Sequence, residues 1–340
     1  MSGKNKIIFG GVPGMDKKYI DRMKKGIIKE CRNVEFIFFG ENIIENKELI
    51  EKYSDASVLI SWDQPMDEYT YKSMPNLKAY CQASVGFNAA NPDMATKYGV
   101  IVTNVSDYCI DEVSNHTITL ILACARKLYI MWPKVKEGIW DCAIAGNINR
   151  FAGSTIGLYG FGKIAKAIAT KLKGFNVNII ANDPYVSDEE GREYNVKMVS
   201  FDTLIETSDY ISLHTPLLPS TKEIFNKSVF KRMKPTAFII NTSRGGLIHQ
   251  NHLYEALTHN LIAGAALDVL KNEPPKDEDK KIIELPNTII TAHSAFVSVE
   301  SAEQQIDFTC RNVGRILKGE KPNYICNPEV LSKIDWIKHP

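Results

Sequence analysis

The sequence predicts an α/β protein with doubly wound parallel sheets in two domains. Short runs rich in Val, Ile and Phe alternate with helical patterns, as in parallel strands joined by crossover helices. A glycine-rich turn directly follows one of these runs. The chain has 340 residues. Because one hydrophobic core usually stops growing near about 250–300 residues, two domains are expected.

Composition and charge exclude several classes of protein. The 41 Lys+Arg balance 40 Asp+Glu, whereas a nucleic-acid-binding protein usually has a pI above about 9. No apolar run approaches the roughly 20 residues that span a bilayer. The seven cysteines are scattered and form no C-x-x-C pair, so we interpret them as reduced thiols in or near the core. We therefore expect a cytoplasmic protein with no nucleic-acid, membrane or metal partner.

The first hundred residues contain five predicted strands, each short and bounded by polar residues, Gly or Pro. They are residues 6–9, 34–39, 57–61, 79–83 and 100–103. Residues 106–131 instead predict one helix, whose start Ser106 and Asp107 can cap. Its middle, 118–125, is apolar on nearly every side, so it must be covered either by the domain core or by a second subunit.

Six further strands are predicted in the second half, separated by helical patterns that favour a second doubly wound sheet. They are residues 155–159, 177–182, 210–214, 237–241, 262–268 and 288–291. After Phe296 a helical pattern continues through Ile316. The charged run 276–281 is interpreted as a solvated loop.

The glycine-rich turn is the strongest local signal. Gly160 allows the tight turn after a strand, Gly162 lets the backbone approach a pyrophosphate, and Ala165 allows close helix–strand packing. The helix that follows offers free N–H groups and a partial positive charge to phosphates. The residues expected to bind a dinucleotide here are Gly160, Phe161, Gly162, Lys163 and Ile164.

An acidic residue at the end of the next strand indicates which dinucleotide is bound. Asp183 can accept hydrogen bonds from the ribose hydroxyls of the adenosine and repels the 2′-phosphate of NADP. No Arg directly follows it. The cofactor expected is therefore NAD.

Three polar residues, Arg244, Glu273 and His293, follow predicted strands of the second sheet, and each is flanked by small or turn-forming residues. The carboxyl ends of parallel strands share one edge of the sheet, where open α/β folds bind ligands. We expect the three side chains at that edge.

With these features the sequence resembles the D-isomer-specific 2-hydroxyacid dehydrogenase family. The resemblance covers nearly the whole chain and is most specific over residues 154–295. Besides the glycine-rich turn, the matching stretches are Ser-Asp-Tyr-Ile-Ser-Leu-His-Thr-Pro-Leu at 208–217, Asn-Thr-Ser-Arg-Gly-Gly at 241–246, Ala-Ala-Leu-Asp-Val at 265–269 and Leu-Pro-Asn through His at 285–293. Residues 107–116 and the Gly-Phe-Gly turn look like the bacterial branch near the C-terminal-binding-protein-like members.

The resemblance implies an NAD-dependent oxidoreductase that interconverts a small 2-keto acid and its D-2-hydroxy acid by hydride transfer. Arg244 would bind the substrate carboxylate, His293 would act as the acid and base, and Glu273 would hold and tune the imidazole. Further cofactor contacts are implied at His214, Thr215, Pro216, Thr242, Ser243 and Asp268. Val85 and Gly86 would meet the substrate carboxylate through their amides.

The resemblance also implies two Rossmann-like domains, with the nucleotide-binding domain inserted in the substrate domain. Residues 1–103 and 297–340 would form a flavodoxin-like substrate domain, and 104–296 the NAD-binding domain. A homodimer is expected, with the helix at 107–130 in its interface. The alternative function is an NAD-responsive, corepressor-like regulatory protein on the same fold. Departures from the family pattern, such as Ala292 in place of Pro, leave the identity of the 2-hydroxy acid open.

Overall fold

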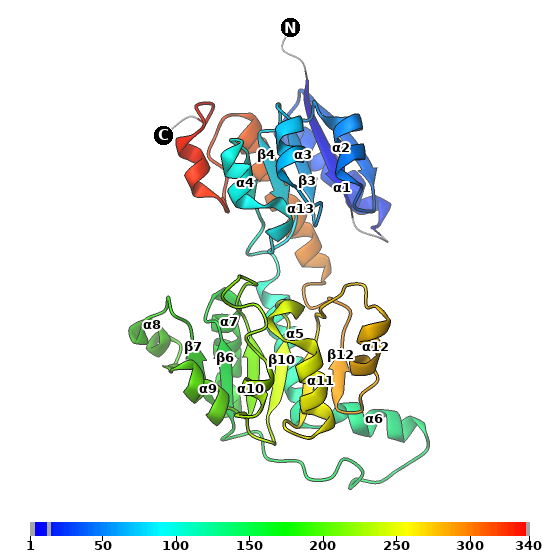
Figure 1. Ribbon diagram of the computed structural model, residues 1–340, viewed down its shortest axis with the longest axis vertical. Helices are drawn as coiled ribbons and strands as arrows, with labels where there is room; N and C mark the ends of the chain where they lie inside the picture. Colours follow the sequence, from blue (N-terminus) through cyan, green and yellow to red (C-terminus); the bar gives the residue numbers. More distant parts are fainter. Residues whose placement is uncertain (1–3, 12–14, 338–340) are drawn as a thin grey trace. The chain divides into compact units, whose positions relative to one another are not determined.

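The computed structural model of the chain describes residues 4–11 and 15–337. It divides into two compact units: unit 1 comprises Met1–Tyr108 and Ser298–Pro340, and unit 2 comprises Cys109–Val297. Each unit has one parallel sheet with helices on its faces (Figure 1). The predicted α/β class with two doubly wound sheets is confirmed.

Unit 1 has the strand order β2-β1-β3-β4-β5, which is the flavodoxin-like order. Its strands are β1 (Asn5–Gly10), β2 (Val34–Gly40), β3 (Val58–Ser61), β4 (Ala79–Gln82) and β5 (Ile101–Thr103). Its helices are α1 (Lys17–Glu30), α2 (Asn46–Tyr53), α3 (Glu68–Ser73), α4 (Pro92–Lys97) and α13 (Val299–Leu317), with short 3₁₀ turns at Asn88–Ala90 and Pro328–Ser332.

Successive side chains of the unit 1 strands enter two different cores, because neighbouring residues of a strand point to opposite faces. Ile7 and Phe9 of β1 pack in the core that α1 and α13 cover. Ile8, between them, packs in the core that α2, α3 and α4 cover. Trp62 lies in the first of these cores, where it contacts the rings of Phe9 and Tyr19.

Unit 2 has the order β12-β11-β10-β9-β6-β7-β8. When the strands are numbered from β6 as strand 1 and read from β8, the order is 3-2-1-4-5-6, as in dinucleotide-binding sheets, and β12 adds a seventh strand at the end. The strands are β6 (Thr155–Tyr159), β7 (Asn178–Asn182), β8 (Lys197–Met198), β9 (Tyr210–Leu213), β10 (Phe238–Asn241), β11 (Gly264–Leu267) and β12 (Thr288–Ile290). The sequence did not predict β8, since two residues carry no period.

The helices of unit 2 cover both faces of its sheet. They are α5 (Ile110–Ala125), α6 (Leu128–Lys136), α7 (Lys163–Lys171), α8 (Asp188–Glu193), α9 (Phe201–Thr207), α10 (Lys227–Phe230), α11 (Gln250–Thr258) and α12 (Asp277–Ile283), with 3₁₀ turns at Leu172–Phe175 and Gly245–Leu247. Ile239 of β10 packs with α9, α10 and α11. Its neighbour Ile240 packs with α5 and α7 on the other face.

The single helix expected over residues 106–131 is wrong in its start and in its length. Asp107 accepts a hydrogen bond from the Tyr324 hydroxyl at 2.9 Å instead of capping, and α5 begins at Ile110. It ends at Ala125 because Lys127 adopts a left-handed conformation, with φ of 51°, which a helix cannot continue. A separate helix, α6, follows.

The charged run 276–281 is a helix start rather than the expected solvated loop. Asp279 is fully buried in α12 and accepts a hydrogen bond from the Lys276 amide at 2.7 Å, with others from Gln250 and Asn272. Burial by itself raises the pKa of this carboxyl, but the hydrogen bonds outweigh it and lower the pKa below its ordinary value.

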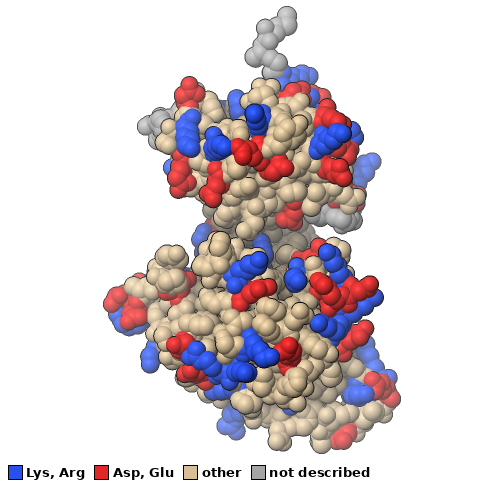
Figure 2. All heavy atoms as spheres, viewed as in Figure 1, with Lys and Arg blue, Asp and Glu red and all other residues tan. Residues whose placement is uncertain are grey.

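The distribution of surface charge, the length of the helices and the burial of the cysteines can be compared with the expectations drawn from composition. In the view of Figure 2, side chains of both signs are interspersed over each unit. None of the helices in the described ranges is long and apolar enough to cross a membrane. None of the seven cysteines, all of which lie in the described ranges, forms a disulfide; six are buried or half-buried, whereas Cys142 is exposed and thus departs from the expected core position.

Replacing Asp279 by Ala should lower the free energy of unfolding by about 1–3 kcal/mol, because buried donors lose their acceptor. Chemical denaturation followed by circular dichroism measures the change. Asp277→Ala is the matched control, since this neighbouring carboxylate is almost fully exposed, and we expect it to change the free energy by less than about 0.5 kcal/mol. Equal effects of the two substitutions would contradict the role of Asp279.

Candidate functional site

The glycine-rich turn lies between β6 and α7 and leaves room for a ligand. Gly160 has φ of 92°, and a Cβ on it would lie 2.7 Å from the carbonyl oxygen of His214, so only glycine fits. A Cβ on Gly162 would meet no atom within 4 Å. In the described part of the chain no side chain caps the start of α7. Its first N–H groups therefore suit a phosphate.

Asp183 directly follows β7 and is tied to the same turn. Its Oδ2 accepts a hydrogen bond from the Phe161 amide at 2.8 Å, and its Oδ1 accepts one from the Tyr185 amide at 2.9 Å. Each carboxylate oxygen can accept more than one hydrogen bond, so both can still receive ribose hydroxyls. The Phe161 side chain is fully buried and packs edge-on against Tyr194. The backbone amide of Phe161 donates to Asp183 and so holds the carboxylate beside the turn.

His214 joins the two halves of the nucleotide fold. Its amide donates to the Tyr159 carbonyl at 2.7 Å, just before the glycine-rich turn. Within the described residues, its buried Nε2 atom has no hydrogen-bond partner. Burial lowers the pKa of His214 from the ordinary 6.5 to about 3, so the ring is neutral near pH 7. Because buried polar atoms usually have a hydrogen-bond partner, this atom fits a site where a bound ligand supplies that partner.

The loop after β10 carries Thr242, Ser243 and Arg244. The Ser243 hydroxyl donates to the Leu213 carbonyl at 2.6 Å, and Thr242 Oγ1 lies 2.9 Å from Thr117 Oγ1. Arg244 donates through Nη1 to the Ser243 carbonyl at 2.6 Å. No acidic side chain among the described residues forms an ion pair with Arg244, so its charge remains to be matched by an anion. Thr215 and Pro216 follow β9, the neighbouring strand.

Glu273 and His293 lie together at the ends of the next strands, β11 and β12. His293 Nδ1 is 2.5 Å from Glu273 Oε2, and Glu273 Oε1 accepts from the Leu270 amide at 3.0 Å. The imidazole is 43% exposed, so it remains open to a substrate. His293 has φ of 48°, in the left-handed region that residues with a Cβ rarely adopt.

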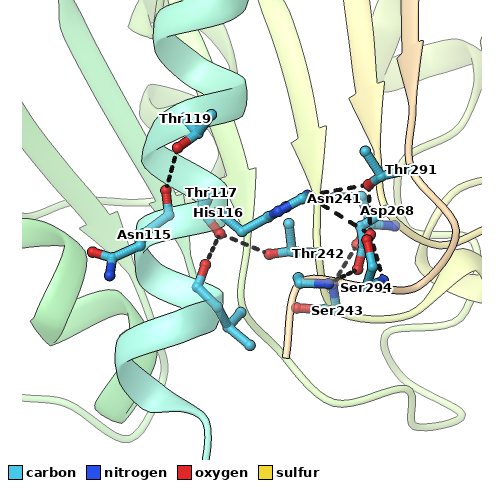
Figure 3. Close-up of polar contacts among 12 residues, drawn as sticks. Asn115, His116, Thr117, Thr119, Asn241, Thr242, Ser243, Asp268, Thr291 and Ser294 are labelled. Carbon is cyan, nitrogen blue, oxygen red and sulfur yellow. Dashed lines mark hydrogen bonds and ion pairs between the residues drawn. The ribbon is translucent and has the colours of Figure 1, made fainter. Parts of the chain in front are cut away.

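Asp268 holds the turn in which His293 lies, and Figure 3 shows its contacts with Thr291 and Ser294. Its buried carboxylate accepts hydrogen bonds from Thr291 Oγ1 at 2.5 Å, from the Ser294 amide at 2.9 Å and from the Ala295 amide at 3.0 Å. Its carbonyl accepts the His293 amide at 2.8 Å. The partners of this side chain are therefore internal, and the expected contact with the nicotinamide end stays a prediction.

Val85 and Gly86 belong to unit 1, in the loop after β4. Asn104 Nδ2 donates to the Val85 carbonyl at 2.7 Å, and the Ser84 hydroxyl donates to the Gly86 carbonyl at 2.9 Å. Side chains thus hold both carbonyls of this loop. Sequence reasoning missed these two supporting residues, and it also missed His116, Thr117 and Thr291 in unit 2. His116 and Thr291 lie in stretches that match the family, 107–116 and 285–293, but nothing in those stretches indicates which loop each side chain contacts.

A glycine-rich turn at a helix start, with a carboxylate on the next strand, defines a dinucleotide-binding α/β protein. A family profile described as "D-isomer specific 2-hydroxyacid dehydrogenase, NAD binding domain" matches residues 118–295. Among curated relatives, a glyoxylate reductase of Thermococcus litoralis is 34% identical over 84% of this chain and 87% of its own length. A glyoxylate reductase of Korarchaeum cryptofilum is 32% identical over the same shares.

A solved structure agrees with these sequence comparisons. The D-lactate dehydrogenase of Lactobacillus jensenii, crystallised with NAD+, has a TM-score of 0.76 and 27% identity, covering 94% of this chain and 99% of its own. The chain belongs to the D-isomer-specific 2-hydroxyacid dehydrogenase family. It is an NAD-dependent oxidoreductase of D-2-hydroxy acids, and the predicted family, enzyme class and cofactor are confirmed.

The lowered pKa of His214 predicts a pH dependence of stability. As pH falls below 6.5, the unfolded histidine takes up a proton, and the folded one does not until about pH 3. Between pH 6.5 and about pH 3 this difference lowers the free energy of unfolding by up to about 1.4 kcal/mol for each pH unit. His214→Gln should therefore lose stability less steeply than the parent between pH 6.5 and 5 in thermal melts. His259→Gln, at an exposed histidine, should keep the parent's slope, and a parallel slope in His214→Gln would contradict the assignment.

Proposed function

We propose that this dehydrogenase reduces a small 2-keto acid to its D-2-hydroxy acid, and catalyses the reverse oxidation, with Arg244, Glu273 and His293 as catalytic residues. The observation that carries the proposal is the 2.5 Å contact between His293 Nδ1 and Glu273 Oε2. Because the carboxylate occupies Nδ1, the Nε2 atom of the ring is the one that exchanges a proton with the substrate. Arg244, with no acidic partner among the described residues, supplies the positive charge that a carboxylate needs.

In the reduction, the Arg244 guanidinium binds the substrate carboxylate and polarises the 2-keto oxygen. His293 donates its Nε2 proton to that oxygen and is left neutral, and Glu273 stabilises the protonated ring before the transfer. When bound, NADH supplies the hydride that C2 receives. In the oxidation His293 removes the hydroxyl proton. The amides of Val85 and Gly86 are proposed as further donors to the carboxylate.

The same proposal covers the cofactor contacts. The backbone of Gly160, Gly162, Lys163 and Ile164 receives the pyrophosphate, and Asp183 receives the ribose hydroxyls. His214, Thr215, Pro216, Thr242 and Ser243 line the other half of the nucleotide.

Residues 1–103 and 297–340 are proposed as the substrate domain, and 104–296 as the NAD-binding domain. Free thiols fit a cytoplasmic location, where reducing systems keep cysteines unpaired.

Small keto acids are the proposed substrate class. Trp62 is only 8% exposed and packs against Phe9 and Tyr19, so its side chain belongs to the core of unit 1. Both of the curated relatives described above carry the name glyoxylate reductase, and glyoxylate is the first compound to test. No observation favours the corepressor-like alternative.

Loss of NADH absorbance across a panel of 2-keto acids, with NADPH in parallel, tests the proposal. We expect turnover of small keto acids and a clear preference for NADH, because Asp183 repels a 2′-phosphate. His293→Ala should lower kcat by about 10²- to 10⁴-fold, and Arg244→Ala should raise KM and lower kcat. Arg232→Ala, at an exposed arginine paired with Asp202 and Glu206, is the control. Near-normal turnover in His293→Ala would rule out the mechanism, and NADH binding without any turnover would favour the regulatory alternative.

The homodimer with the helix at 107–130 in its interface stays a proposal, and we assign α6 and the segment after it to that interface as well, because they leave large apolar side chains exposed. These are Leu128, Trp132, Val135, Ile139 and Trp140, of which Trp140 is 91% exposed. No residue of α6 is buried. An apolar surface of this kind is typical of an interface between copies of a chain.

Light scattering at micromolar concentration should give twice the chain mass of 38.2 kDa, and Trp132→Glu with Trp140→Glu should halve the mass, because charges would be placed in the interface. Tyr69→Glu, at an exposed aromatic in unit 1, is the control and should stay dimeric. A monomeric parent protein would exclude the dimer.

A further inference from the structure

Two consecutive residues of α5, His116 and Thr117, reach two different loops at the carboxyl edge of the unit 2 sheet (Figure 3). The loop that Thr117 contacts carries Arg244, and the loop that His116 contacts carries His293. One helix therefore touches the supports of both proposed catalytic side chains. His116 contacts Thr291, and Thr117 contacts Thr242.

The contact with the Arg244 loop has a defined direction. Thr117 donates its hydroxyl proton to the Val113 carbonyl at 2.7 Å, so in its 2.9 Å contact with Thr242 it accepts, and Thr242 donates. The same loop is closed by Asn241, whose Nδ2 donates to the Arg244 carbonyl at 2.9 Å. The backbone that carries the guanidinium is thus held from α5 and from the end of β10.

The contact with the His293 loop also has one direction. An ionised carboxylate only accepts, so Thr291 gives its hydroxyl proton to Asp268 Oδ1 at 2.5 Å. Thr291 Oγ1 must then accept in its 3.1 Å contact with His116 Nε2. His116 therefore carries a hydrogen on Nε2. The chain of donors runs from the His116 ring to Thr291 and on to the buried carboxylate.

This chain ends on the turn that sets the direction of the proposed acid and base. The left-handed conformation of His293 is unfavourable for a residue with a Cβ and needs support from its surroundings. Asp268 gives that support by accepting the amides of His293, Ser294 and Ala295 through its carbonyl and carboxylate. His116 Nε2 also lies 3.7 Å from Asp268 Oδ1, and thus adds positive potential next to a buried negative charge.

We propose that His116 is a positioning residue for the reaction: its Nε2–H, acting through Thr291 and Asp268, fixes the turn that aims His293, while Thr117 fixes the Arg244 loop. Consecutive residues of one rigid helix thereby set the separation of the guanidinium and the imidazole. The inference rests on the proposed roles of Arg244 and His293, and its first test is independent of catalysis.

The first test is the tautomer of His116, measured by ¹⁵N NMR at pH 8 on the full chain labelled at its histidines, without cofactor or substrate. The signals that His116→Gln removes identify the ring. We expect a protonated Nε2 and an unprotonated Nδ1 in the parent protein, and loss of this preference in Thr291→Val, which lacks the acceptor. A ring protonated on Nδ1 in the parent protein would overturn the proposal.

The second test is steady-state kinetics on the best keto acid of the panel, with kcat expressed per NADH-binding site. Thr291→Val and His116→Leu should each lower kcat by about 10- to 100-fold, because a small displacement of a catalytic group is costly. The dissociation constant of NADH should change by less than about twofold, since the glycine-rich turn is untouched. The double variant should be no slower than either single one, because both act through one chain of hydrogen bonds.

Two controls separate positioning from packing. His116→Gln keeps a donor at a similar reach and should recover most of the lost kcat. Thr119→Val removes a hydroxyl from the same helix, but one that bonds to the Asn115 carbonyl of α5 itself, and kcat should not change. If Thr291→Val does not fold, the comparison of His116→Leu with His116→Gln decides, since the His116 side chain is partly exposed.

Each outcome bears on one claim. An unchanged kcat in both single variants, or a loss of NADH binding in step with activity, would overturn the positioning role. An active His293→Ala variant would instead refute the proposed function, and the NMR result would still judge the direction of the hydrogen bonds.

Discussion

The buried carboxylate of Asp268 constrains the site more than any other group. Asp268 directly follows β11, the strand between those that lead to Arg244 and to His293. A carboxylate removed from water must have its lone pairs satisfied, and here the donors are Thr291 and the amides of Ser294 and Ala295. These donors can reach it only if the chain turns back sharply after β12. The left-handed backbone of His293 is a consequence of that turn.

Helix α5 both packs on the sheet of unit 2 and contacts two loops of the proposed site. Its buried side chains recur every three or four residues, as Val113, Thr117, Leu120, Ile121 and Cys124 do, and pack it on the sheet. Near its start the same periodicity brings polar residues to the edge where the strands end. The apolar part fixes the position of the helix, and its rigidity transfers that position to the two loops. The packing of the core thus determines the geometry of the polar site.

Sequence motifs supplied most of the residues of the candidate site, because the chemistry expected of them depends on local backbone. Gly160 must adopt a positive φ and Asp183 must directly follow a strand, and both requirements are visible in a short stretch of sequence. Contacts between distant segments gave no such signal. His116 and Thr291 are 175 positions apart, and neither shows a local preference for the other. The helix start expected at Asp107 failed for the same reason, since a distant residue, Tyr324, binds that carboxylate.

The sequence by itself determined the fold class, the family, the cofactor and the strands, apart from the two residues of β8. It did so because hydrophobic period and turn chemistry act over a few residues. Only the tertiary structure decided which side chains meet. It buried Asp268 and Asp279, ended α5 at Ala125, and brought His116 to Thr291. The physical reason is that these contacts join segments far apart in the chain, and the packing of strands and helices, rather than any local preference, sets their distances.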